Sequence, residues 1–321
     1  MRGILTIFKK EMEDYFSSTR FLLILALIVM VAIIIASMVG MSIREEAKGM
    51  TKPTLLFLYL FTSTGKLFSL VQFIGFFGPL IGIILGFDAI NRERASRTLA
   101  KLISQPIYRD AVIAGKLLAG VITIALMFVA ITLVISALGI RMLGIIPGPD
   151  EVLRLAVYLI VSILYISFWL AISILFSVIF KSTSTSALAA LALWIFSSFL
   201  VPLGASFVSD ALAPISQTEN GADVESVVKH EEVQHVLYLF SPTNLYSDSA
   251  STILDPMRKT TSTVILVGPM ERISQERFQN PLSAGQSIAI VAPYVLSLIA
   301  LTFLCFGICY VAFMRQEIRT V

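Results

Sequence analysis

The chain has 321 residues, of which 57% are hydrophobic and 14% charged, and its formal net charge at pH 7 is +3. Its mean hydropathy of +0.88 lies far above the range of soluble globular proteins. These values exclude an ordinary soluble domain and indicate a protein that is embedded mostly in a membrane.

Residues 1–20 have the pattern of an amphipathic helix. One helical stripe is apolar, and it consists of Ile4, Leu5, Phe8, Met12, Tyr15 and Phe16. The charged residues lie off this stripe, and they are Lys9, Lys10, Glu11, Glu13 and Asp14. We expect a helix that lies in the membrane interface. The alternative is a cytosolic helix that packs on other protein.

Six uncharged runs follow, each close to the roughly 20 residues that a membrane-spanning helix needs. They are Phe21–Ile43, Leu67–Phe87, Leu117–Ile140, Leu155–Phe180, Ser182–Ser209 and a run from about Gln286 to Met314. A further apolar stretch, Leu55–Phe61, is too short to span and is interpreted as interfacial or re-entrant. We expect the first run to be a retained anchor rather than a cleaved signal peptide, because it lacks a convincing small-residue cleavage site.

The distribution of lysine and arginine predicts the orientation. With the N-terminus inside, the inner segments 1–20, 88–116, 181–185 and 315–321 hold 13 basic residues in roughly 60 positions, and the outer segments hold 11 in about twice that length. We therefore expect a multi-pass protein of the plasma membrane with both termini in the cytoplasm.

The second run carries small residues on one face. Gly78, Gly82 and Gly86 are spaced by four, which lets another helix approach closely, and Pro79 between them predicts a kink. Helix packing is the simpler interpretation of this stripe, and a hinge for gating is the alternative.

The segment Asp88–Pro106 stands out because it carries six charged residues between two apolar runs. It is predicted to be a helix ended by Pro106, with Leu99, Leu102 and Ile103 on a short apolar stripe. Its charge keeps it out of the bilayer, so it lies in the cytosol close to the membrane. The charge fits contact with anionic lipid, whereas the apolar stripe favours a cytosolic protein partner.

Residues 208–285 form the largest polar region and are predicted to be a small extracellular cap. His230 and His235 lie there, but their spacing of five places them on different helical faces, so a solvated surface is favoured over a metal site. Cys305 and Cys309 lie one turn apart in the last run, where apolar packing is the expected role.

The basic segment resembles the corresponding segment of type-2 ATP-binding-cassette (ABC) exporter permeases, close to the NosY-like permeases. The matching residues are Glu93, Arg94, Ala95, Ser96, Thr98, Leu99, Leu102, Ser104, Gln105, Pro106, Arg109, Gly115 and Lys116. The opening FKKEMEDYFSSTRF is similar to the N-terminal helix of that family, and the layout of six spans also agrees. The chain departs from the family at Arg97, where relatives usually carry glycine.

The resemblance implies a role for this segment. Residues 88–106 would be a coupling helix that seats in a groove of a separate ATPase subunit and passes nucleotide-driven motion to the spans. The residues implied at this interface are Glu93, Arg94, Ser96, Arg97, Thr98, Leu99, Leu102 and Ile103. Two ATPase copies and a second permease chain, identical or related, would complete the assembly.

The hydrophobic runs and the charge placement, with which the layout of the resembling permeases agrees, predict an all-α membrane fold with a defined order of parts. The expected parts are an N-terminal interfacial helix (1–20), spans one to five (21–207) that include the coupling helix (88–106), an extracellular loop or cap (208–285), a sixth span (286–314) and a cytoplasmic tail (315–321). Membrane lipids are expected contacts, and no nucleic-acid partner is expected.

The chain contains no phosphate-binding GxxxxGK[ST] loop, because Asp110 holds the first glycine position of the Gly115-Lys116 candidate and Leu117 its Ser/Thr position. We therefore expect a non-catalytic chain without catalytic residues, cofactor or metal of its own, with ATP and Mg²⁺ bound by the partner ATPase. An ion-coupled secondary transporter is disfavoured because none of the six runs holds a charged residue. An intramembrane enzyme is disfavoured because both histidines lie outside the spans, and a non-transport scaffold stays open.

Overall fold

The computed structural model describes residues 2–46, 56–62, 69–98, 108–218, 221–222, 224–256 and 281–315. The helices are α1 (Arg2–Ser17), α2 (Thr19–Glu46), η1 (Leu56–Leu60), α3 (Leu70–Gly86), α4 (Asn91–Ala95), α6 (Arg109–Leu143), α7 (Pro149–Ile179), α8 (Thr183–Ile195), η2 (Phe196–Leu200), α9 (Val201–Leu212), α10 (Val224–Tyr238), α11 (Pro242–Leu254) and α13 (Ala284–Arg315). The short strands β1 (Gln217–Thr218) and β2 (Gly221–Ala222) form an antiparallel pair.

Six helical stretches in the described part of the chain are long and apolar enough to cross a membrane. They are Thr19–Ile43, Leu70–Ala95, Arg109–Leu143, Pro149–Ile179, Thr183–Leu212 and Ala284–Arg315. The predicted all-α membrane fold is therefore confirmed, and the chain is a multi-pass membrane protein.

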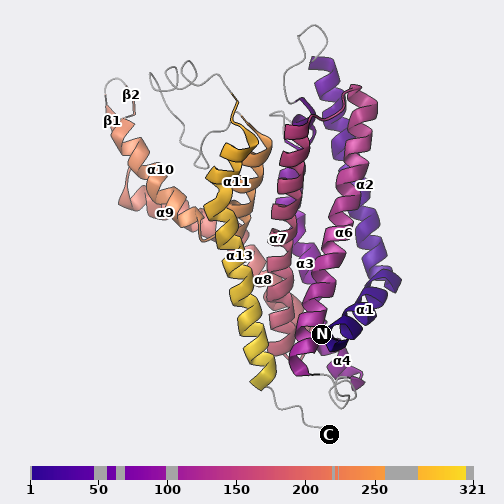
Figure 1. Ribbon diagram of the computed structural model, residues 1–321. Coiled ribbons are helices and arrows are strands. Elements are labelled where there is room, and N and C mark those ends of the chain that lie inside the picture. Colours follow the sequence, from indigo (N-terminus) through magenta and orange to yellow (C-terminus); the bar gives the residue numbers. More distant parts are fainter. Residues whose placement is uncertain are drawn as a thin grey trace.

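Helix α7 is the central element of the bundle, and α3, α6, α11 and α13 pack around it (Figure 1). Its residues 165–175 are all buried, among them Tyr165 and Trp169, so neighbouring elements surround this part of the helix on every side. A helix that is apolar on all sides is stable where other helices or lipid surround it.

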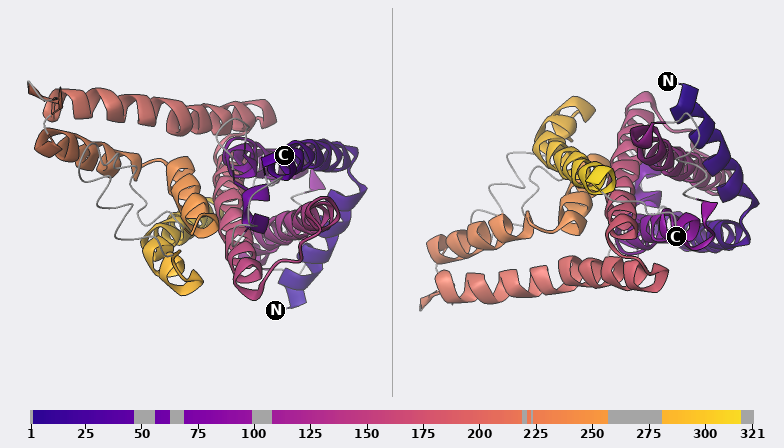
Figure 2. Two further views of the ribbon diagram at one scale, coloured as in Figure 1. Left: turned by 90° about the horizontal axis from the view of Figure 1, so that it is seen from above. Right: turned by 90° about the horizontal axis from the view of Figure 1, so that it is seen from below.

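Helices α8 and α9, with the π-turn η2 between them, form one long rod that runs away from the rest of the bundle (Figure 2). Helix α10 packs beside α9 and leads the chain back toward the bundle. Its His230 is buried, with Nδ1 2.9 Å from the Ala213 carbonyl and Nε2 3.3 Å from Ser209 Oγ. The expectation of a solvated surface is thus wrong for this histidine, because α9 covers it.

Helix α11 lies along α7, α13 and α3 rather than outside the bundle. Arg154, which is 1% exposed, holds this arrangement together. Its guanidinium donates to the Ile253 carbonyl at 2.8 Å and to Ser287 Oγ at 3.0 Å, and it pairs with Asp150 at 2.8 Å. A single buried cation thus links α7, α11 and α13.

The short apolar stretch near residue 58 folds as η1, which contacts α2 and α7. Phe57 and Phe61 are fully buried, and the Phe57 amide donates to the Glu151 carboxylate at 3.1 Å. Glu151 also accepts the Gly148 amide at 2.8 Å in a capping box at the start of α7. The stretch therefore covers one end of the bundle.

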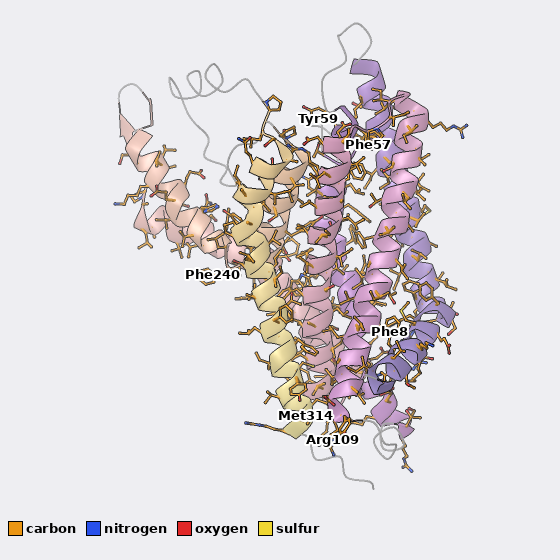
Figure 3. All side chains as sticks on the ribbon, in the orientation of Figure 1. Phe8, Phe57, Tyr59, Arg109, Phe240 and Met314 are labelled. Atoms are coloured by element: carbon orange, nitrogen blue, oxygen red, sulfur yellow. The ribbon has the colours of Figure 1, made fainter. Side chains whose placement is uncertain are left out.

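Helix α4 lies at the opposite end, together with α1 and the last turn of α13 (Figure 1). Phe8, Arg109 and Met314 mark this end, which we call the α4 end, while Phe57 and Tyr59 mark the other (Figure 3). The two ends of the described chain thus lie on the same side of the bundle.

Candidate functional site

Helix α4 is attached to the end of α7 through its backbone. The hydroxyl of Ser177 accepts the amides of Ile90 at 3.0 Å and Asn91 at 3.1 Å, so a side chain of α7 caps the N-terminus of α4. The Arg94 guanidinium donates to the carbonyls of Phe180 at 3.2 Å and Val178 at 3.5 Å. Both termini of this short helix are therefore fixed to α7.

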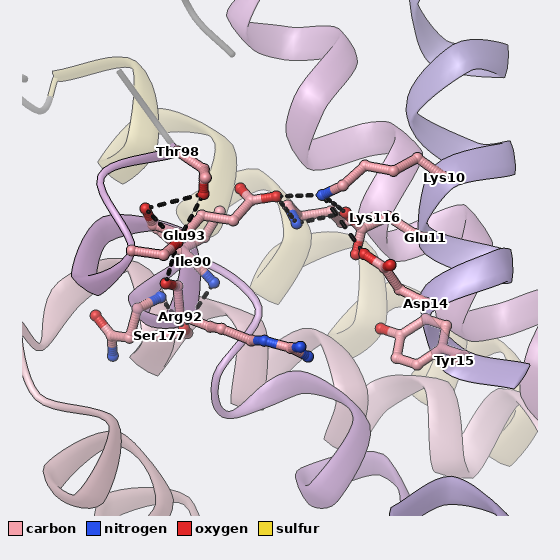
Figure 4. Close-up of polar contacts among 12 residues, drawn as sticks. Lys10, Glu11, Asp14, Tyr15, Ile90, Arg92, Glu93, Thr98, Lys116 and Ser177 are labelled. Carbon is pink, nitrogen blue, oxygen red and sulfur yellow. Dashed lines mark hydrogen bonds and ion pairs between the residues drawn. The ribbon is translucent and has the colours of Figure 1, made fainter. Parts of the chain in front are cut away.

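A cluster of two lysines and two glutamates joins α4 to α1 and α6 (Figure 4). We call Lys10, Glu11, Glu93 and Lys116 the charged cluster. Lys116 Nζ lies 2.7 Å from Glu11 Oε1 and 2.9 Å from Glu93 Oε1. Lys10 Nζ lies 2.9 Å from Glu11 Oε1 and 2.6 Å from Glu93 Oε1. Each ammonium thus contacts both carboxylates, and the four charges cancel.

The charged cluster is withdrawn from water, since Lys116 is 1% exposed, Glu11 7% and Glu93 8%. Burial alone would raise the pKa of Glu11, but the charges and hydrogen bonds of Lys116 and Lys10 outweigh it, so this pKa lies below its usual value. Burial would lower the pKa of Lys10, but hydrogen bonds and charge from Glu93 and Glu11 raise it above its usual value. Lys10 and Glu11 therefore both stay ionised near neutral pH.

Helix α1 packs against α6 over its length, so only its exposed side can lie in the membrane interface as the sequence predicts. Ile7 is 2% exposed and lies against Gly115, where an added Cβ would come within 2.8 Å of it. Tyr15 donates to the Leu85 carbonyl of α3 at 3.0 Å. Leu5 and Phe16, by contrast, remain exposed on the other face. Glu11, assigned from the sequence to the polar face, instead faces α6.

The continuous helix expected from Asp88 is not present in the described residues, because α4 spans only Asn91–Ala95. Arg97 adopts a left-handed backbone with φ of 58°, which interrupts the helix there. That conformation favours glycine, the residue that the resembling permeases usually carry at this position.

The predicted interface residues thus divide into four groups, and Arg94 forms one of them, since it donates to the carbonyls at the end of α7. Glu93 is buried in the charged cluster, where it contacts Lys10 and Lys116. Ser96, Arg97 and Thr98 are exposed, and the Ser96 and Thr98 hydroxyls lie 2.8 Å apart. Leu99, Leu102 and Ile103 lie outside the described residues.

The glycine stripe of α3 faces α7. An added Cβ at Gly82 would lie 2.6 Å from the Ile166 carbonyl oxygen and 2.8 Å from the Leu170 amide, and one at Gly86 would lie 2.9 Å from Ser173 Cβ. At Gly78 the nearest atom would be Ile166 Cγ1 at 3.0 Å. The two helices are therefore in backbone contact, which only glycine permits.

Pro79 leaves one carbonyl of α3 without its helical partner. Its missing amide would have donated to the Gly75 carbonyl four residues earlier. The hydroxyl of Tyr165 donates to that carbonyl at 2.7 Å and lies 3.0 Å from Thr243 Oγ1, which is 2.9 Å from Ser198 Oγ. Because tyrosine has one proton to give, Thr243 donates to Tyr165 and Ser198 donates to Thr243. A directed chain of hydroxyl groups thus joins η2, α11 and α7 to the proline of α3.

Sequence reasoning did not assign a function to Lys10, Glu11 or Ser177, and it named Lys116 only among the residues that match the resembling permeases. One signal for Glu11 is present in the sequence, since it follows Ile7 by four and precedes Tyr15 by four. The pairing of α1 with α6 has no such signal, because the residues lie more than 100 positions apart. Within the described ranges, no group of three or more His, Cys, Asp and Glu side chains is placed to hold a metal ion.

A family model described as "ABC-2 family transporter protein" matches residues 5–318, which is nearly the whole chain. A search among curated proteins found no match.

Proposed function

This chain belongs to the ABC-2 transporter family and is thus a membrane-spanning component of an ABC transporter, and we propose that it works as an exporter permease driven by separate ATPase subunits. Two permease chains, identical or related, and two ATPases form the complete machine. The ATPases bind ATP and Mg²⁺, and this chain supplies the path through the plasma membrane. Within the family, the resemblance of residues 93–116 favours the NosY-like permeases.

The attachment of α4 is the observation that carries this proposal. Ser177 and Arg94 tie α4 to α7, and Glu93 ties it to α1 and α6 through the charged cluster. A force applied to α4 is therefore passed by direct contacts to α1, α6 and α7. This is the mechanical property that a coupling segment needs, and it supports a seat for the ATPase at the α4 end, in the cytoplasm.

Exposed aromatic side chains on α3 and the fifth span favour a path between two chains. Phe76 lies 5.2 Å from Trp194 and 6.1 Å from Phe199, measured between ring centroids. Phe76 is 37% exposed and Phe199 46% exposed. Because both residues belong to membrane-spanning stretches, this surface suits a second chain and an amphiphilic or lipid-like cargo.

Association with an ATPase tests the proposal. The variant Leu99→Asp places a charge on the apolar stripe of the coupling segment, and we expect the ATPase that co-purifies with the unmodified chain to be lost. The matched control is Ile146→Asp, which alters a 79% exposed side chain in the α6–α7 connection, at the end opposite α4. Equal ATPase recovery with both variants contradicts the coupling role, whereas ATPase lost from the control points to misfolding.

The alternatives give different results in transport assays. An ion-coupled secondary transporter moves its cargo in vesicles that hold an ion gradient and no ATP. A scaffold moves none under either condition. We expect transport only when ATP and the ATPase are both present, and transport driven by the ion gradient alone would disprove the ABC mechanism for this chain.

A further inference from the structure

A pocket of about 390 Å³ opens at the α4 end between α1, the first turns of α2, the end of α3 and α4. One part of its lining is apolar, formed by Phe21, Ile24, Ile84 and Leu85. The remainder is mostly charged. Arg20 lies at the start of the first span and Asp88 two residues after the end of α3, so the pocket lies at the depth where a bilayer changes from hydrocarbon to headgroups.

The charged side chains of the pocket that can pair with a ligand include equal numbers of positive and negative groups. The four members of the charged cluster line its inner wall and neutralise one another. Toward the opening lie two carboxylates and two guanidinium groups, and they belong to Asp14, Asp88, Arg20 and Arg92. An anion alone would face two carboxylates here, and a cation alone two guanidinium groups. The pocket therefore suits a ligand with one group of each sign.

These groups are also loosely held. Arg20 lies 3.4 Å from Asp88, and its side chain is 73% exposed, while Asp14 lies 3.7 Å from Lys10 and is 53% exposed. Such pairs contribute little to stability, so they can exchange partners with a ligand. Arg92 extends along the pocket toward the side where Asp14 and Tyr15 lie (Figure 4).

The apolar part of the lining continues onto the outer surface of the bundle. Phe21 and Leu85 are 4% and 5% exposed, whereas Ile84, one turn before Asp88, is 38% exposed. A ligand whose polar end occupies the charged region can therefore extend an apolar chain past Ile84 along the membrane-facing side of α3.

We propose that this pocket binds phosphatidylethanolamine from the leaflet on the α4 side. The phosphate pairs with Arg20 and Arg92, the ammonium donates to Asp14 and Asp88, and one acyl chain lies against Ile84. Phosphatidylcholine lacks the N–H donors, and phosphatidylglycerol lacks the cation, so both fit less well. The bound lipid connects α1 with α4 and stabilises their contact by mass action. This proposal does not depend on transport or on an ATPase.

The test measures which lipid remains bound to the full chain. The purified chain is reconstituted in vesicles with equal amounts of phosphatidylethanolamine, phosphatidylcholine and phosphatidylglycerol, then extracted in mild detergent and analysed by native mass spectrometry. We expect phosphatidylethanolamine to be retained about threefold or more over the other two, as weak charged pairs allow. The double variant Asp14→Asn/Asp88→Asn should lose this preference.

Two further variants separate binding from folding. Asp210→Asn/Arg141→Gln alters two exposed charges away from the pocket and should keep the lipid preference. Ile84→Trp fills the opening with all charges intact and should reduce lipid retention, so it tests the site even if the double variant does not fold. Equal retention of the three lipids by the unmodified chain overturns the proposal, as does unchanged retention of phosphatidylethanolamine by Ile84→Trp.

Discussion

The ammonium of Lys116 lies 2.9 Å from the carboxylate of Glu93, which joins the first turns of the third span to the short helix that follows the second. Glu11 completes the contact from α1 at 2.7 Å. Three segments that are separate in the sequence therefore meet at one buried cation. Because an unpaired charge at this depth is strongly unfavourable, the segments are expected to move together.

Removal of the Lys116 charge should destabilise the protein. In Lys116→Met, Glu11 and Glu93 keep only the half-exposed Lys10 as partner, and the expected loss is about 3–5 kcal/mol of unfolding free energy. Thermal unfolding in detergent, followed by fluorescence, measures the change. Lys9→Met is the matched control, because Lys9 is exposed on α1. If both variants melt at the same temperature, the charged cluster does not hold these helices together.

The stability of the bundle should depend on pH at both extremes. The pKa of Glu11 is lowered in the folded chain, so its stabilising effect is complete above the ordinary value of 4.5 and is lost as the pH falls through the folded value. The pKa of Lys10 is raised, so its effect is complete below the ordinary value of 10.5 and is lost as the pH rises through the folded value. We expect a plateau in melting temperature between these limits. In Glu11→Gln, the fall of the melting temperature at acidic pH should be smaller than in the unmodified chain. If the melting temperature of that variant falls at acidic pH as much as that of the unmodified chain, Glu11 does not cause the loss of stability.

The contact between α3 and α7 should tolerate no side chain at Gly82. In Gly82→Ala the new methyl group meets the backbone of Ile166 and Leu170, which cannot rotate away, and we expect about 1–3 kcal/mol of destabilisation. Gly307→Ala is the control in α13, because nothing lies within 4 Å of its added Cβ. The two melting temperatures make the comparison, and equal values argue against backbone contact between these helices.

Tyr165 and Pro79 should be coupled in a double-mutant cycle. Tyr165→Phe removes the donor to the Gly75 carbonyl and should cost about 1–3 kcal/mol, since a buried carbonyl is left unpaired. In a Pro79→Ala background the restored amide can satisfy the same carbonyl, so the cost of Tyr165→Phe should fall. Unfolding free energies of the four proteins give the coupling energy. Additive costs mean that the tyrosine does not replace the missing proline bond.

The sequence was sufficient for the class of fold because the signal is local. Each span must form its backbone hydrogen bonds within one helix and present apolar side chains to lipid. A run such as Leu155–Phe180 can therefore be recognised as a span from its own residues. The glycine stripe of α3 is similar, since spacing by four puts Gly78, Gly82 and Gly86 on one face whatever their partner. Its partner, α7, could not be inferred, because any apolar helix satisfies the same stripe.

The predictions for the shorter elements were less accurate than those for the spans. The helix expected over 88–106 starts at Asn91 in the structure, where Ser177 from another helix supplies the cap. Local sequence cannot reveal a cap that comes from 86 residues away. His230 was assigned to a solvated surface for the same reason, since the covering residue Ser209 lies on α9.

By itself the sequence determined six membrane-crossing helices, a basic segment between the second and third, and the family resemblance, because hydrophobicity and charge along the chain are properties of the residues alone. Only the tertiary structure decided that Lys10, Glu11, Glu93 and Lys116 form one neutral group, and that a pocket with balanced charges lies beside it. The physical reason is that a buried charge is stable only next to an opposite one, and which charges become neighbours depends on how the helices pack.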